Sequence, residues 1–156
     1  MKNLNKNKLP GFWILIITGL LLLASLILGQ MMSFINYDFP VSLGLQEPVN
    51  VVGETAVAVN KAFGLGDTII YIPLLVFGLI GLWLKKEWGV YSMLCALGIT
   101  AYWPMVSLFF FFFAKGTPGF YFSNYFSYTI LLIVFTAYGL WGIWYIYKNR
   151  KLLYKD

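Results

Sequence analysis

The side chains that could do chemistry are carboxylate, amide, phenol and indole groups carried by long apolar segments. These groups supply hydrogen-bond acceptors and donors beside flat apolar rings, which is the lining that a site for an amphipathic small molecule needs. We therefore predict a ligand-binding pocket formed by the following residues: Gln30, Asp67, Tyr71, Tyr102, Trp103 and Tyr128.

These residues are predicted to lie at one depth in a membrane. At a rise of ~1.5 Å per helical residue, Tyr71 lies ~6 Å deeper than Asp67. By the same rise, Trp103 lies ~22 Å from Trp88, in the opposite half of its segment. The remaining members of the set reach this level on the other two segments, so every apolar segment contributes to one layer.

Two prolines, Pro73 and Pro104, occur in the same layer. A proline inside a helix has no N–H and crowds the carbonyl four residues earlier, which kinks the helix. Because a freed carbonyl in lipid must find another partner, hydroxyl groups or water in a buried cavity can serve it. Two kinks at one depth would open a pocket. Ordinary kinked packing, with tyrosines at the membrane interface, is the alternative.

Asp67 follows Gly66 and precedes an apolar run, which is typical of a helix N-cap. In that position its carboxylate would accept the free N–H groups of the first turn and interact with the positive end of the helix dipole. A carboxylate that binds ligand at the mouth of a pocket is the alternative. A calcium site with Asp38, Glu47 and Glu54 is a further option, but the chain lacks a calcium-loop signature.

The composition excludes several kinds of catalytic site. The chain has no histidine and one cysteine, Cys95, so it has no histidine-based metal site, no disulfide within the chain and no Ser-His or Cys-His pair. We predict no catalytic residues, no metal and no cofactor, and a protein that is not an enzyme. Catalysis by carboxylates and tyrosines alone is the remaining option.

The apolar segments define the class of protein. With 60% hydrophobic and 11% charged residues, the chain lies outside the range of soluble domains, in which roughly 25% of residues are charged. The first segment is longer than the core of a signal peptide, so we expect it to be retained. We predict an all-α membrane protein with a single domain, residues 1–156, that is a bundle of four transmembrane helices over about 12–34, 67–84, 88–113 and 125–147.

The distribution of positive charge predicts an orientation. Nine of the 11 Lys and Arg residues flank one side: Lys2, Lys6, Lys8, Lys85, Lys86, Lys148, Arg150, Lys151 and Lys155. Lys61 and Lys115 flank the other side. Since cytoplasmic loops are rich in Lys and Arg, we predict a multi-pass protein of the cell membrane with both termini in the cytoplasm. The net charge of +5 lies at membrane edges and does not indicate nucleic acid as a partner.

The two outer loops are predicted at 35–66 and 114–124. In the first, apolar residues recur at steps of three and four after Pro48, which indicates a short amphipathic helix at the interface. Gly64 or Gly66 would lie near the end of that helix. Because the segment is rich in β-branched valines, a small hairpin is the alternative.

Small residues recur where the second and fourth segments end, as Gly78-Leu-Ile-Gly-Leu-Trp83 and Gly139-Leu-Trp-Gly-Ile-Trp144. Two tandem helical hairpins would give this pattern, and so would ordinary glycine packing with tryptophans at the interface. Glycine and serine also permit close approach of a second membrane protein or another copy of the chain. An accessory subunit of a larger membrane complex is therefore an alternative function.

Asp67 lies six residues before Pro73, and Tyr91, Ser92 and Pro104 follow in the next segment. This arrangement resembles the EXPERA family of sterol isomerases and sigma-2-receptor-like proteins. The resemblance implies a sterol-like ligand held among acidic and aromatic residues. The chain departs from the family pattern because its first segment has no acid within it.

The predicted function is the binding of a lipid-like or amphipathic small molecule in the outer half of the membrane. The lipid bilayer, such a ligand and a membrane-protein partner are the expected partners. A transporter or channel subunit is disfavoured because the chain has no charged residue deep in a segment, and so no evident proton relay or ion path.

Overall fold

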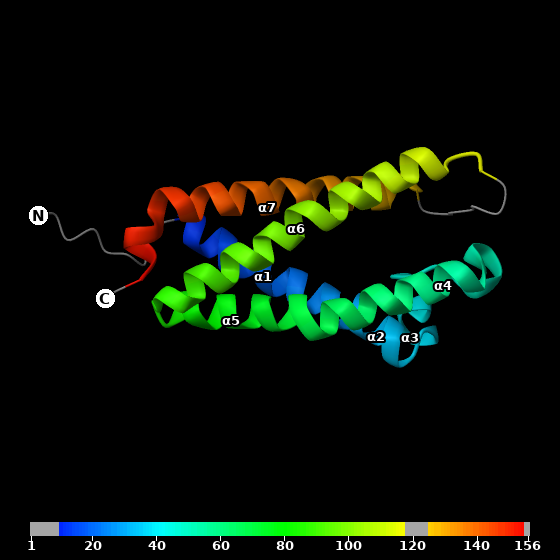
Figure 1. Cartoon of the computed structure of the whole chain (residues 1–156), viewed down its shortest axis with the longest axis horizontal. Coiled ribbons are helices and arrows are strands. Elements are labelled where there is room, and N and C mark those ends of the chain that lie inside the picture. Colours follow the sequence, from blue (N-terminus) through cyan, green and yellow to red (C-terminus); the bar gives the residue numbers. More distant parts are fainter. Residues whose placement is uncertain (1–9, 118–124, 155–156) are drawn as a thin grey trace, which may run out of the picture.

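The computed structural model describes residues 10–117 and 125–154, and every regular element in this part of the chain is a helix (Figure 1). Two segments, labelled η, are π-helical. The elements are α1 (Pro10–Ser25), η2 (Leu26–Met31), α2 (Met32–Ile35), α3 (Asp38–Ser42), α4 (Val49–Gly66), η3 (Asp67–Tyr71), α5 (Ile72–Trp83), α6 (Glu87–Ala114) and α7 (Tyr125–Leu153).

Several elements run into one another, so the described chain contains four long helices. They cover Pro10–Ile35, Val49–Trp83, Glu87–Ala114 and Tyr125–Leu153, and each is long and apolar enough to cross a membrane. The prediction of an all-α chain with four helices long and apolar enough to span a membrane is confirmed for the described residues. We refer to Pro10–Ile35 and Val49–Trp83 as the first and second long helices.

The second long helix starts earlier than predicted. Residues 54–66 are helical and continue directly into the apolar segment, so they do not form a separate helix beside it, and the helix is kinked just before them, at Gly53. Gly66 has φ −59° and ψ −45°, and Asp67 also has helical angles, so neither glycine predicted to end the helix does so. The prediction that Asp67 is a helix N-cap is therefore wrong. A glycine ends a helix where its φ is positive; in this helix that angle occurs at Gly53, with φ 81°.

The long third helix, α6, is the shared partner of α5 and α7, which pack against it over most of the bundle (Figure 1). The start of α1, the end of α7 and the turn between α5 and α6 lie together at one end of the molecule. We call this the basic end, because Lys85, Lys86, Arg150 and Lys151 lie there. From this end α6 diverges from the second long helix, so α6 packs on α5 far more than on α4.

Glycines bring the backbones of neighbouring helices together on both sides of α6. A Cβ atom at Gly81 would overlap the backbone of Gly89, and a Cβ atom at Gly139 would lie 2.6 Å from the backbone nitrogen of Ala101. Likewise, a Cβ atom at Gly142 would lie 2.9 Å from the side chain of Leu97. The repeated small residues at the ends of the second and fourth helices therefore form packing contacts inside the chain.

Tyrosines of α7 connect this helix to the first long helix. The Tyr138 hydroxyl donates a hydrogen bond of 2.9 Å to the carbonyl of Leu15. Closer to the basic end, the ring of Tyr145 lies where a side chain at Gly11 would otherwise be. These contacts attach the first helix to the bundle, in addition to its packing on α5.

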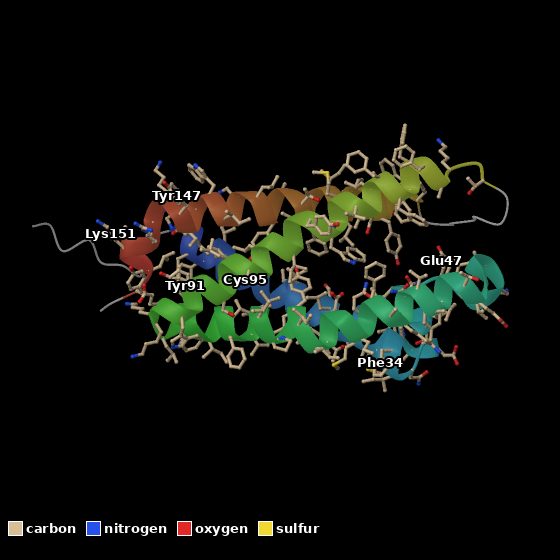
Figure 2. The ribbon with its side chains drawn as sticks, in the orientation of Figure 1. Phe34, Glu47, Tyr91, Cys95, Tyr147 and Lys151 are labelled. Carbon is tan, nitrogen blue, oxygen red and sulfur yellow. The ribbon has the colours of Figure 1, made fainter. Side chains whose placement is uncertain are left out.

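Many large apolar side chains cover the outside of the bundle, as expected for helices that contact lipid (Figure 2). In the five-residue phenylalanine run of α6, Phe112 and Phe113 are 70% and 73% exposed, whereas Phe111 is buried. The run therefore covers several faces of the helix. It does not form a single apolar stripe that could mark a binding site.

The connection between the first two long helices is folded and carries α3. The Tyr37 hydroxyl donates to the backbone carbonyl of Glu47, and the Asn60 amide donates to the Gln46 side chain. The Tyr128 hydroxyl of α7 donates to the carbonyl of Leu45, at 2.7 Å. Hydrogen bonds thus hold this connection against both α4 and α7.

Candidate functional site

The first and second long helices cross at their π-helical segments. Elements η2 and η3 contact each other, and a Cβ atom at Gly64 would overlap the backbone carbonyl of Gln30. Since an extra residue per turn leaves backbone groups out of the regular ladder, π-helical segments are frequent at functional sites. The two crossing segments are therefore the natural place to look for a site. We call the crossing, with Gln30, Asp67, Tyr71 and Thr100, the polar crossing.

Two acceptors at the polar crossing lack partners. Asp67 is 8% exposed, and within residues 10–117 and 125–154 no side chain forms a hydrogen bond or ion pair with its carboxylate. The side-chain oxygen of Gln30 is buried and has no hydrogen-bond partner in the described chain. Leaving a buried acceptor unpaired costs about 1–3 kcal/mol, and more for a charged group. Such groups need a specific explanation, especially in a membrane helix.

Tyr71 connects the second long helix to α6. Its hydroxyl lies 2.6 Å from the Thr100 hydroxyl, which itself donates to the backbone carbonyl of Ala96. Because threonine has one hydroxyl proton, Tyr71 must be the donor in this pair. The hydrogen bond joins two side chains that are 5% and 1% exposed.

Phe63 and Trp103 form a second connection between the same helices. Their ring centroids are 5.8 Å apart with an interplanar angle of 88°, an edge-to-face contact. Phe63, Asp67 and Tyr71 are spaced by four residues, so they follow one face of the second long helix. Asp67 therefore lies between the Tyr71–Thr100 pair and the Phe63–Trp103 pair, which we call the two cross-links.

The hydroxyl protons around Asp67 are already used. Thr68 donates to the carbonyl of Gly64 at 2.6 Å, and Ser33 donates to the carbonyl of Gly29. The protons of Tyr71 and Thr100 are used in the cross-link described above. In addition, the N–H of Ile72 bonds to the carbonyl of Asp67, five residues back, and Pro73 supplies no N–H to the turn before it. The hydroxyl groups at the polar crossing therefore have no proton left for the Asp67 carboxylate, and among the side chains of the crossing only the Gln30 amide keeps N–H groups without a partner in the described chain.

The structure brings some of the predicted residues together and separates others. Asp67 and Tyr71 lie at the crossing with Gln30, and Trp103 lies one turn of α6 beyond Thr100. Tyr102, which was also predicted to line the pocket, is 71% exposed on the surface of α6 and is not brought to the polar crossing. One residue further along a helix turns the side chain by about 100°, and Trp103 takes the inward position.

Tyr128 was also predicted to line the pocket, but its hydroxyl bonds to the carbonyl of Leu45. It therefore holds the connection after the first helix in place. The residues that the sequence analysis missed are Phe63, Gly64 and Thr100. Their spacing from Asp67 and Trp103 by three or four residues places them on the same helix faces, and this signal applies because the second long helix includes the residues before Asp67.

The acidic residues do not form a metal site. Within the described ranges, no group of three or more His, Cys, Asp or Glu residues is placed to hold a metal ion. The calcium option, which required Asp38, Glu47, Glu54 and Asp67 together, is therefore not supported.

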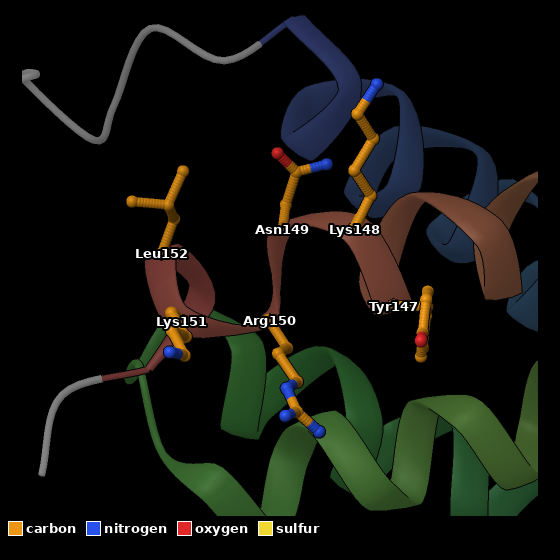
Figure 3. Close-up of a pocket in the computed structure, with 6 residues that line it drawn as sticks. All are labelled: Tyr147, Lys148, Asn149, Arg150, Lys151 and Leu152. Carbon is orange, nitrogen blue, oxygen red and sulfur yellow. The ribbon is translucent and has the colours of Figure 1, made fainter.

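A surface hollow lies at the basic end and not at the polar crossing (Figure 3). It has a volume of about 320 Å³ and is lined by residues 147–152 of α7, including Lys148, Arg150 and Lys151. All six lining residues are consecutive in one helix, so no second helix contributes a side chain to it. We assign no site to this hollow.

No family model, curated protein or solved structure matches the chain. The resemblance to EXPERA proteins therefore depends on the residues quoted for it alone.

Proposed function

We propose that the protein binds an amphipathic small molecule whose polar head occupies the polar crossing, between the two cross-links. The observation that carries this proposal is the pair of unpartnered acceptors, Gln30 and Asp67, at one buried crossing. A ligand head that donates hydrogen bonds would satisfy both groups. An apolar tail would lie beside the rings of Phe63 and Trp103 and extend toward the lipid.

The energetics favour this assignment over a purely structural one. A buried carboxylate does not stabilise a helix bundle unless a donor or a cation satisfies it. Asp67 does not cap a helix, so the structural role expected for it does not apply. Ligand sites combine apolar and aromatic linings with a few polar groups that fix orientation, and the two cross-links supply that combination.

Ligand-induced stabilisation should depend on residues of the site. In lipid nanodiscs, we expect dodecylamine or dodecanol to raise the melting temperature of the wild type by about 5 °C at saturating concentration. The double variant Asp67→Asn, Trp103→Ala should lose most of this shift, because it removes the acceptor charge and one cross-link. The measurement is a thermal unfolding curve followed by intrinsic fluorescence or light scattering.

The matched control is Glu54→Gln with Tyr102→Ala, since both residues are exposed on the same two helices. This control should keep the full shift. If neither probe stabilises the wild type, or if both double variants retain the same shift as the wild type, the proposed site is wrong.

We also propose that the protein lies in the cell membrane with both termini in the cytoplasm, on the support of the cations at the basic end. In a Cys95→Ala background, a membrane-impermeant maleimide added to intact cells should label Thr117→Cys and leave Lys151→Cys unlabelled. Permeabilised cells should show labelling at both positions. Labelling of Lys151→Cys alone in intact cells would reverse the orientation.

The packing of glycines reduces the support for an accessory subunit. Gly81 and Gly139 were candidates for contact with a partner protein, but their free faces are used against Gly89 and Ala101 inside the chain. Small-molecule binding is the function with a specific structural observation behind it.

A further inference from the structure

We propose that the head group bound at the polar crossing is positively charged, and that Asp67 is its counter-ion. This inference deepens the proposed function and rests on it. It concerns the charge of the ligand head. The protonated amine of an amphiphile and a free monovalent cation both carry the positive charge that Asp67 would neutralise.

The first argument is the balance of donors and acceptors. The hydroxyl protons of Ser33, Thr68, Tyr71 and Thr100 are all used within the protein. The carboxylate of Asp67 and the side-chain oxygen of Gln30 remain as acceptors. An ionised carboxylate can only accept, so the head that complements Asp67 is one that donates.

The second argument is the position of the positive charges. In residues 10–117 and 125–154 six cations lie at or near the ends of the helices: Lys85, Lys86, Lys115, Lys148, Arg150 and Lys151. The seventh, Lys61, lies inside the second long helix, six residues before Asp67. Within those ranges none forms an ion pair with Asp67. An amine head would supply the charge that the protein itself does not place beside this carboxylate. Hydrogen bonds between charged groups are roughly twice as strong as neutral ones.

The third argument is the aromatic side chains on the same face. Phe63 lies one helical turn before Asp67, and its ring contacts Trp103. The face of an indole attracts a cation through its quadrupole, and this attraction strengthens when the cation is desolvated. A carboxylate with an indole nearby therefore favours an ammonium group over a neutral head of the same size.

The test compares two probes with the same chain and different heads. Dodecylamine, which is protonated at neutral pH, and dodecanol are titrated into the wild type, Asp67→Asn and Asp67→Glu in zwitterionic nanodiscs, with empty nanodiscs to subtract partitioning. We expect the wild type to bind the amine about tenfold more tightly than the alcohol, as one charge-assisted hydrogen bond would provide. Asp67→Asn should bind both probes equally, and Asp67→Glu should restore the preference for the amine.

The Glu54→Gln variant is the matched control, because it removes an exposed carboxylate from the same helix and should keep the wild-type preference. A parallel arm replaces sodium chloride with choline chloride in the absence of either probe. Stabilisation of the wild type, but not of Asp67→Asn, by sodium alone would support the cation site and identify a free ion as its source.

The remaining outcomes separate the two proposals. Equal binding of amine and alcohol to the wild type would overturn the inference about charge while leaving the proposed function in place. An unchanged preference in Asp67→Asn, with melting temperature close to that of the wild type, would also overturn it. Binding of neither probe would remove the proposed function itself.

Discussion

Replacing Gly89 with alanine is expected to lower the free energy of unfolding by roughly 2–3 kcal/mol, the upper range for inserting a methyl group into a close-packed contact. The added Cβ atom would overlap the backbone of Gly81 on α5. Neither backbone can move away without opening the contact between α5 and α6, which together form one of the two largest helix interfaces. The measurement is steric trapping or thermal unfolding in a mild detergent.

Gly98 provides the matched control on the same helix. A Cβ atom there meets nothing within 4 Å, so Gly98→Ala should leave stability unchanged or raise it by up to about 1 kcal/mol, the difference in helix propensity. Equal effects of the two substitutions would show that α5 and α6 do not approach as closely as described.

Replacing Gly64 with alanine should have the largest effect on the candidate site. Its Cβ atom would overlap the carbonyl of Gln30, so the first and second long helices would have to separate. We expect a loss of roughly 2 kcal/mol in stability. Binding of dodecylamine should weaken by at least about tenfold, because Gln30 and Asp67 would no longer be held at one crossing. Calorimetric titration in nanodiscs measures the second quantity.

The control for this substitution is Gly66→Ala, two residues along the same helix. A Cβ atom at Gly66 meets nothing within 4 Å, and Gly66 already has helical angles. This variant should bind the probe as the wild type does and be slightly more stable. If Gly64→Ala binds with wild-type affinity, the crossing does not position the ligand.

The four long helices could be predicted from the sequence because length and composition decide membrane insertion. Their arrangement could not, since it depends on which glycines face which backbone. Gly64 and Gly66 were interpreted as helix terminators, which is the usual role of glycine in water. In this bundle the important property of glycine is that it has no side chain, because this permits the close crossing of Gly64 with Gln30.

The candidate site could be predicted only in part, because it also depends on how the helices pack. Depth along a helix can be counted from the sequence, and it gave Asp67, Tyr71 and Trp103 at one level. Rotation around a helix axis requires knowing the neighbours, so Tyr102 was included although it faces outward. The partners of Tyr71 and Trp103, which are Thr100 and Phe63, depend on how α6 crosses the second long helix, and that geometry is not encoded in any local pattern.

The hydrogen bond from Tyr138 to Leu15 joins the first helix to the last across 123 positions. The first helix is synthesised before α7, so this hydrogen bond can form only after the other three long helices have been made. In contrast, the crossing of the first and second long helices, and the packing of α5, α6 and α7, join neighbours in sequence and can form as the helices emerge. The polar crossing takes its residues from the first three long helices, so a chain truncated before α7 would contain every residue of the site but lack the hydrogen bond that attaches the first helix to the last.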